Sequence, residues 1–229
     1  MTDILKEITD ADTLFSIWLT AKICFWAFLL HAVIGVLLAW YLSSKKAPFR
    51  NLIDTLVTFP LIFPPIATGF LLLLLIGRFG ILGSFLQKSL GTELIFTQKA
   101  LVIAAFTAGL PLVVKPVQAA ISSSAISLIE ASLTLGKSRI TTFLFVVVPN
   151  VKRSILTGLT LGLGRSLGEV GITLMIGGNI IGKTNTLSLE VYNAVFEGNY
   201  FRAGALCSIL LTVSIIIFTL LRKMEAEKI

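Results

Sequence analysis

Apolar residues gather in five long stretches that are separated by short polar segments. The stretches cover about residues 13–42, 52–76, 100–121, 155–176 and 203–221. A helix of about 20 residues crosses the roughly 30 Å hydrocarbon core of a bilayer, and each stretch is close to this length or longer. The pattern therefore predicts an all-α polytopic membrane protein, with about five transmembrane helices in a single domain over residues 1–229.

The second stretch is interrupted by prolines. Pro60, Pro64 and Pro65 fall within six residues, and each removes a backbone donor from a helix. Irregular backbone at membrane depth is tolerated only when it is buried in protein or lines a wet cavity. We expect these prolines, with the hydroxyls of Thr58 and Thr68, to lie along a substrate path. A kink that neighbouring helices satisfy is the alternative.

Small residues recur at helical spacing in the fourth stretch. Gly158 and Gly162 form one pair four residues apart, and Gly164 and Gly168 form another. This spacing lets helix backbones approach closely in a bilayer, where apolar burial gives no drive for association. We expect these glycines to pack against another helix, either within one subunit or at a subunit interface or moving wall of a pathway.

The same stretch contains two charges, Arg165 and Glu169, four residues apart on one helix face. Arg165 lies ten residues beyond Ile155, or roughly 15 Å into the span. Ionisable residues at this depth are costly and are candidates for function. The pair either belongs to the translocation path or is a self-neutralising structural pair.

A polar insert, residues 122–150, lies between the third and fourth stretches. Ser127 and Glu130 have the spacing of a capping box, in which each side chain accepts from an unpaired N–H at a helix start. Gly136 can end that helix, because glycine adopts the left-handed conformation, and Ser138 can cap a second helix. The insert predicts two short helices folded back at a glycine, suited to contact with another protein.

Composition agrees with a membrane protein. Apolar residues make up 55% of the 229, charged residues 14%, and the mean hydropathy is +0.94. Soluble domains carry about 25% charged residues. Two cysteines without metal-type spacing and one histidine, His31, indicate no metal site and no catalytic residues. We expect His31 to be packed within its span; a proton relay is the alternative.

Basic residues indicate the orientation of the chain. The segments near residues 43–54, 115–153 and 222–229 carry 11 Lys and Arg against four acidic residues, whereas the opposite face balances seven against seven. Cytoplasmic loops carry the Lys and Arg excess. This predicts a cytoplasmic insert, an N-terminus outside and a cytoplasmic C-terminus. The net charge of +7 then reflects topology, and no nucleic-acid partner is expected.

A match to the phosphate-loop pattern GxxxxGK[ST] occurs at Gly177–Thr184. A functional phosphate loop follows a β-strand and opens a helix in an α/β domain. Here the pattern follows an apolar span and falls on the predicted outer face. We therefore expect an external turn without nucleotide.

The insert resembles the EAA motif of ABC importer permeases, EAA-x3-G-x9-I-x-L-P. In this chain it stands as Glu130-Ala131-Ser132, Gly136 and Val146-x-Val148-Pro149. Three positions depart from the motif, at Ser132, Val146 and Val148. Further blocks, Asp54–Leu73, Gly77–Gly83 and especially Gly164–Tyr192, look like the permease subunit of molybdate importers and their tungstate and sulfate relatives.

The resemblance implies a type I importer permease fold and an inner-membrane location. Two copies of the chain would form the pathway above a dimer of cytoplasmic ABC ATPases, which would hold ATP and Mg²⁺; no cofactor is implied on this chain. Coupling helices within residues 127–142 would contact the ATPase. The residues implied there are Ser127, Glu130, Ala131, Leu135, Gly136, Lys137 and Arg139.

An extracytoplasmic binding protein would dock on the loops at 77–99 and 177–200, where Arg78, Asn179, Lys183 and Asn185 are candidate contacts. Sulfate or another anion is the alternative substrate. An ATP-independent secondary transporter is a second class, but such proteins usually show internal repeats, and none is evident. A membrane-embedded enzyme is a third class, disfavoured because no catalytic cluster is visible.

Overall fold

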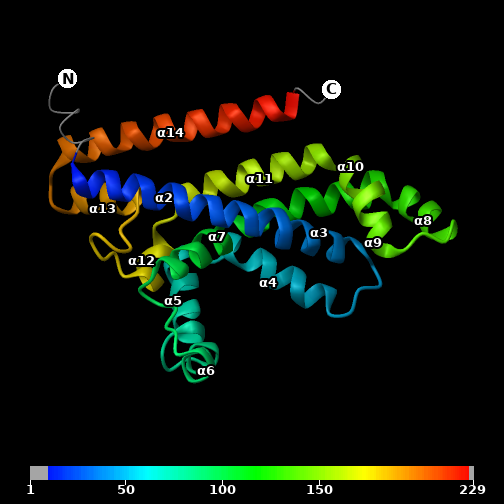
Figure 1. The fold of residues 1–229 in the computed structure, drawn as a ribbon, viewed down its shortest axis with the longest axis horizontal. Helices are drawn as coiled ribbons and strands as arrows, with labels where there is room; N and C mark the ends of the chain where they lie inside the picture. Colours follow the sequence, from blue (N-terminus) through cyan, green and yellow to red (C-terminus); the bar gives the residue numbers. More distant parts are fainter. Residues whose placement is uncertain (1–9, 227–229) are drawn as a thin grey trace.

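The computed structural model describes residues 10–226, and the regular elements in this range are all helices (Figure 1). Three of them are continuous and apolar enough to cross a bilayer. The first joins α2 (Ala11–Leu30), the π turn η1 (His31–Gly35) and α3 (Val36–Ser43). The second joins α7 (Gln98–Ala120), η2 (Ile121–Ala125) and α8 (Ile126–Thr134). The third is α14 (Tyr200–Ala226).

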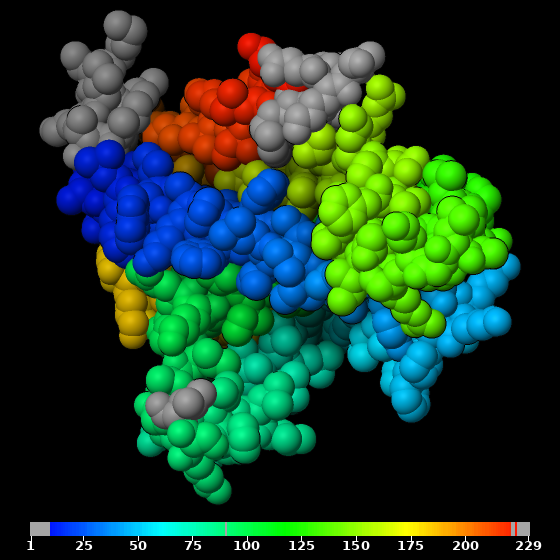
Figure 2. Space-filling model, turned by 45° about the vertical axis from the view of Figure 1, so that its right-hand side comes forward, coloured from blue at the N-terminus to red at the C-terminus, as the bar shows by residue number. Residues whose placement is uncertain are grey.

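The second apolar stretch is two helices rather than one. α4 (Arg50–Ile62) ends where Phe63 becomes extended, with φ −85° and ψ 144°, and α5 starts at Pro65 (Pro65–Ile76). A helix, α6 (Ile81–Leu90), follows α5 at 42° in the segment where the sequence predicted only a polar loop. α5 and α6 form an arm that projects sideways from the other helices (Figures 1 and 2).

The fourth stretch is also broken. α11 (Lys152–Leu167) ends at Gly168, and α12 (Gly171–Gly177) begins after Val170. Before it, α9 (Arg139–Thr142), η3 (Phe143–Val147) and α10 (Val148–Asn150) form a helical segment bent by 77° from α11. Counting each bent pair as one span gives five, as predicted, but the pairs are α5 with α6 and α9–α10 with α11.

α7 is the central helix. Its small residues are almost completely buried: Ala104 and Ala108 pack with Ile172 and Ile176 of α12, and Gly109 lies against Gly162 of α11. A Cβ at Gly162 of α11 would lie 2.6 Å from Val113 Cγ2. Close backbone approach of this kind is the usual way to associate helices in a bilayer, so the sequence expectation for this glycine is met.

The loops gather at two opposite ends of the helices. α8 and α9 protrude at one, which we call the elbow end; α12, α13 (Leu187–Phe196) and the start of α2 lie at the other, the far end (Figure 1). α14 runs from the far end toward the elbow end. An apolar groove of about 340 Å³ lies between α14, α2 and α11, lined by Cys24, Phe28, Leu163, Leu210 and Ile217 among others.

Candidate functional site

The elbow, residues 126–142, comprises α8, a turn and α9 and protrudes from the surface in light green (Figure 2). The residues that the sequence assigned to coupling are all exposed on it: Ser127, Glu130, Ala131, Leu135, Gly136, Lys137 and Arg139. Large apolar side chains are exposed beside them, with Leu135 79% and Ile140 70% accessible. This combination of apolar and charged surface at a helix end is typical of a protein-binding surface.

The predicted capping box at the start of the elbow is wrong. Ser127 lies inside a helix that continues without a break from α7 through η2, and the N-cap position, Ala125, has helical backbone and no side-chain cap. The upstream N–H groups are already bonded within the helix. No unpaired donor is therefore left there for the Ser127 hydroxyl or the Glu130 carboxylate.

The predicted glycine turn is confirmed. Gly136 has φ +77° and follows the last turn of α8. Its N–H donates to the Leu133 carbonyl at 3.0 Å, and the Lys137 N–H donates to the Ser132 carbonyl at 3.1 Å. These two bonds are the Schellman pattern, which requires a left-handed residue at this position. The chain reverses here because glycine adopts that conformation without strain.

The second half of the elbow is fixed by hydroxyl groups. The Ser138 hydroxyl accepts from the Thr141 N–H at 3.1 Å, which confirms the predicted N-cap of α9. Ser132, which replaces alanine of the EAA motif, is buried with its hydroxyl 2.9 Å from that of Thr142. At the base of the elbow, the Phe143 ring stacks on Trp40 of α3 with centroids 4.5 Å apart. The elbow is therefore attached to the first span.

Arg165 and Glu169 form an ion pair across the end of α11. Arg165 Nη1 lies 2.6 Å from Glu169 Oε2, although no N–H is aligned on that oxygen. Glu169 Oε1 accepts from the Ile172 N–H at 2.6 Å, so the carboxylate also caps α12. A cavity of about 10 Å³, room for about one water, lies beside the buried carboxylate. The two charges therefore pair within the chain, while the Arg165 side chain remains 31% exposed.

The four glycines of α11 divide into two groups. Gly158 and Gly162 contact α7, where a Cβ would lie 3.1 Å from the Val113 carbonyl oxygen and 2.6 Å from its Cγ2, respectively. A Cβ at Gly164 or Gly168 would have no neighbour within 4 Å. Packing within the subunit therefore explains the first pair only. The second pair lies on an open side of the helix, next to Arg165.

The prolines and threonines of the second apolar stretch differ in exposure. Pro64 and Pro65 are exposed at the break between α4 and α5, and Pro60 is half-buried inside α4. Thr58 donates its hydroxyl to the Asp54 carbonyl at 2.7 Å. Thr68 is 3% exposed and donates to the Pro64 carbonyl at 3.2 Å. The predicted place of Thr68 on an open path is therefore wrong, because its side chain is buried and its hydroxyl donates to the carbonyl four residues earlier.

His31 is packed as the sequence predicted. It is fully buried, its ring stacks on Phe106 at 5.1 Å, and Nε2 lies 2.9 Å from the Phe106 carbonyl oxygen. Arg78 lies between α5 and α6 on the arm, which packs on α12 of the far end; it is exposed and lies 3.6 Å from Glu93. Lys183 is exposed at the far end itself. Both can contact a docked protein.

Two asparagines at the far end have other contacts. Asn179 is half-buried and exchanges side-chain hydrogen bonds with Asn193. Asn185 is 1% exposed and donates to Glu190 Oε1 at 2.7 Å. The prediction that Asn185 contacts a binding protein is therefore wrong: its side chain stabilises the loop from inside.

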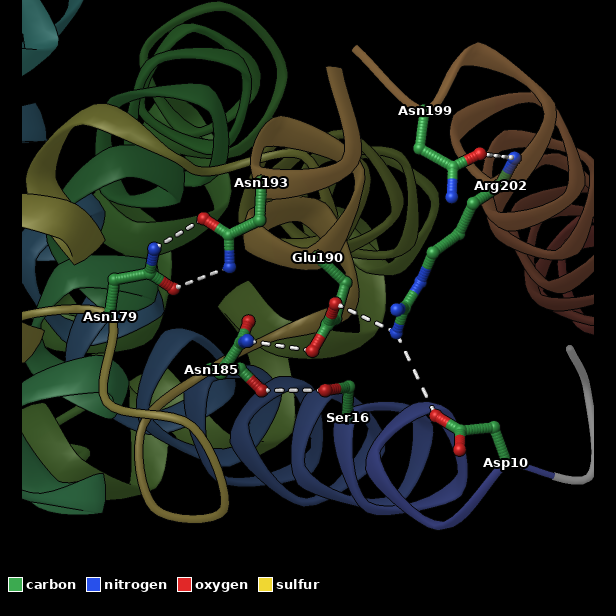
Figure 3. Close-up of polar contacts among 8 residues, drawn as sticks. All are labelled: Asp10, Ser16, Asn179, Asn185, Glu190, Asn193, Asn199 and Arg202. Carbon is green, nitrogen blue, oxygen red and sulfur yellow. Dashed lines mark hydrogen bonds and ion pairs between the residues drawn. The ribbon is translucent and has the colours of Figure 1, made fainter. Parts of the chain in front are cut away.

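The sequence analysis missed a polar network at this end (Figure 3). Arg202 of α14 lies 3.5 Å from Glu190 of α13 and 3.7 Å from Asp10 at the start of α2. Ser16 of α2 donates to the Asn185 carbonyl at 2.9 Å. Burial raises the pKa of Glu190, and Arg202 opposes this shift. These residues lie far apart in the sequence and in no periodic pattern, so no local signal could have joined them.

The phosphate-loop pattern forms a turn. It follows helix α12 rather than a strand, and the Thr184 hydroxyl is buried, where it donates to the Gly177 carbonyl at 2.7 Å and accepts from the Ile180 N–H. A hydroxyl used in this way cannot serve a metal ion.

Fold and site together define a multi-pass helical membrane protein with an exposed elbow at one end. The model of the family described as "Binding-protein-dependent transport system inner membrane component" matches residues 32–223. The chain belongs to this family of ABC transporter permeases, and it is similar to permeases of molybdenum transport systems.

Three relatives illustrate the similarity. The chain is 34% identical over 220 residues to the probable transport system permease protein NifC of Clostridium pasteurianum, covering 96% of this chain and 76% of that one. It is 35% identical to the molybdenum transport system permease protein ModB of Azotobacter vinelandii, covering 82% and 83%. It is 29% identical to the sulfate transport system permease protein CysT of Salmonella typhimurium, covering 96% and 79%.

A solved structure shows the same fold. It is that of a bacterial alginate ABC transporter in complex with an alginate pentasaccharide-bound periplasmic protein. The TM-score is 0.75 with 17% identity, over 96% of this chain and 80% of that chain.

Proposed function

We propose that this chain is the permease subunit of an ATP-driven importer that moves an oxyanion, molybdate or tungstate, into the cytoplasm by alternating access. The elbow carries the proposal. It combines an exposed Leu135 and Ile140 with a rigid glycine turn, and it lies opposite the loops at the far end. A partner bound at the elbow could thus transmit movement to the spans.

The proposed assembly has two copies of the chain in the bilayer and a dimer of ABC ATPases at the elbow. The ATPase subunits would bind ATP and Mg²⁺ and perform hydrolysis, while this chain would be non-catalytic and carry no cofactor. A substrate-loaded binding protein would dock at the far end, with Arg78 and Lys183 among the exposed contacts. The excess of Lys and Arg at the elbow end supports a cytoplasmic elbow, an external N-terminus and a cytoplasmic C-terminus.

Molybdate is favoured by the relatives that carry its name, and sulfate is the second candidate because a sulfate permease aligns over 96% of the chain. Reconstitution in proteoliposomes with an ABC ATPase and an extracytoplasmic binding protein from the same organism tests the proposal. We expect uptake of ⁹⁹Mo-molybdate that requires ATP inside and the binding protein outside, and that tungstate competes for. Stronger competition by sulfate would reassign the substrate. Uptake that persists without the ATPase would indicate a secondary transporter.

A further inference from the structure

Arg165 presents a charge on an open part of the molecule, well inside the span. It is the fourteenth residue of α11, roughly 20 Å from the helix start at Lys152. Its side chain is 31% exposed, whereas that of Glu169 is 1% exposed. An exposed cation at such depth is too costly to face hydrocarbon. This side of α11, with Gly164 and Gly168 beside it, therefore faces water or protein.

The Glu169 carboxylate holds the Arg165 guanidinium in position. One oxygen accepts from the Ile172 N–H of α12, and the other lies 2.6 Å from Arg165 Nη1. The carboxylate is thereby anchored on both sides of the break between α11 and α12. Because no N–H of Arg165 is aligned on it, and no other acceptor for Arg165 is recorded among residues 10–226, the guanidinium keeps donors for a further ligand.

The chemistry of this arrangement suits a tetrahedral oxyanion. A planar guanidinium can donate two parallel hydrogen bonds to two oxygens of one anion. An arginine in the span without an acidic neighbour would bind a dianion too tightly for release. Here the Glu169 carboxylate neutralises the charge of Arg165. A conduit needs binding that is strong enough for entry and weak enough for release.

We propose that Arg165 is a transient binding site for the oxyanion in the translocation pathway, and that Glu169 is the positioning residue that orients Arg165 and weakens its hold. The inference rests on the proposed function and names the residue pair through which that function selects an anion. It also explains how a pathway can pass a dianion with little exposed positive charge.

The test uses the permease–ATPase complex in nanodiscs without the binding protein, at low ionic strength. Equilibrium binding of ⁹⁹Mo-molybdate and ³⁵S-sulfate is measured on the wild type, Glu169→Gln and Arg165→Gln. Glutamine at 169 can still accept from the Ile172 N–H but no longer cancels the charge. We expect Glu169→Gln to bind at least about tenfold more tightly than the wild type, which corresponds to about 1.4 kcal/mol, and to transport more slowly.

Arg165→Gln should lose binding and uptake while still assembling with the ATPase, as measured by co-purification and melting temperature. Arg165→Lys keeps the positive charge but lacks the two parallel donors of the guanidinium. It should bind the anion more weakly than the wild type. Lys22→Gln is the matched control, because Lys22 is a lysine of a different span, α2, and donates to Gln98 of α7. It should bind as the wild type does.

Equal uptake by Arg165→Gln and the wild type would overturn the inference and leave the proposed function intact. So would an absence of anion binding in both the wild type and Glu169→Gln, or a weaker affinity in Glu169→Gln. If the wild-type system imports no oxyanion at all, the proposed function itself fails.

Discussion

The hydroxyls of Ser132 and Thr142 lie 2.9 Å apart in the interior of the elbow and join α8 to α9. Both side chains are almost completely buried, at 8% and 1% exposure. The motif that this segment resembles has alanine in place of Ser132. This chain therefore has a hydrogen bond between α8 and α9 that an alanine could not make.

We expect Ser132→Ala to lower the free energy of unfolding of the elbow by about 1–2 kcal/mol, because the Thr142 hydroxyl is left buried without its partner. Thr142→Val should cost a similar amount. The double variant should cost less than the sum of the two, since both polar groups are then gone. Melting temperature and the anions imported per ATP hydrolysed measure the effect. Ser123→Ala, at an exposed helical site outside the elbow, is the control. Additive losses would contradict a hydrogen bond between Ser132 and Thr142.

Gly136→Val should uncouple ATP hydrolysis from transport. A β-branched residue at φ +77° is strained by about 1–2 kcal/mol or more, although the position is open and no side chain would clash. The strain distorts the Schellman turn that orients α9. We expect normal insertion in the membrane, with uptake at least about tenfold lower at unchanged basal ATPase activity. Gly136→Asn tolerates the left-handed region and should retain most uptake. Normal coupling in the valine variant would show that the turn is dispensable.

Two glycines on α11 provide a paired test of packing. Gly162→Ala forces a Cβ to within 2.6 Å of Val113 Cγ2, so α11 and α7 must separate. We expect a loss of about 1–3 kcal/mol, the usual cost of overpacking. Gly164→Ala meets nothing within 4 Å and should leave folding unchanged or slightly more stable, because alanine favours helix. Detergent melting temperatures compare the two; equal effects would refute the assignment of faces.

Arg202→Gln should destabilise the far end in a pH-dependent manner. Burial already raises the pKa of Glu190 above its ordinary value of 4.5, and losing Arg202 raises it further. An acid with a raised folded pKa favours the folded state only while it is protonated, so this contribution is lost as pH rises through that pKa. The deficit relative to wild type should be largest near neutral pH, about 1–3 kcal/mol, and smaller toward pH 4.5.

The second variant, Arg202→Gln with Glu190→Gln, removes the titrating group and should flatten the pH dependence. Arg78→Gln is the control, because Arg78 and Glu93 are both exposed, and exposed pairs contribute at most about 1 kcal/mol. A deficit in Arg202→Gln that does not vary with pH would show that Glu190 is not the group concerned.

The sequence predicted those features that depend on local chemistry. Apolar length predicted the three continuous spans, Gly136 predicted the turn, and Ser138 predicted the cap of α9. The predicted capping box at Ser127 is absent because capping requires free N–H groups, and a helix that continues through a π turn leaves none. Whether the preceding span ends before the insert is decided by packing of Ile121 and Ala125 in the core, which no short motif reports.

Long-range relationships could not be predicted. Asn185 carries a polar side chain in a loop, where exposure is the ordinary expectation. Its burial follows from contacts with Glu190 and with Ser16, the latter 169 residues away. The different surroundings of the pair Gly158 and Gly162 and the pair Gly164 and Gly168 likewise depend on the rotation of α11 against α7, although both pairs have the same spacing of four residues.

The groove beside α14 has a mechanical consequence. At the far end this helix is joined to α13 and α2 through Arg202 and through contacts of Ala203 and Leu206. Along its length only 17% of its most apolar window is buried, and a groove of about 340 Å³ opens between it, α2 and α11. Farther along, Ile217 packs against Cys24, Leu163 and Leu167. α14 is thus held by its far-end contacts and by Ile217. Thermal displacement should stay small up to Ile217 and increase from there toward Lys223.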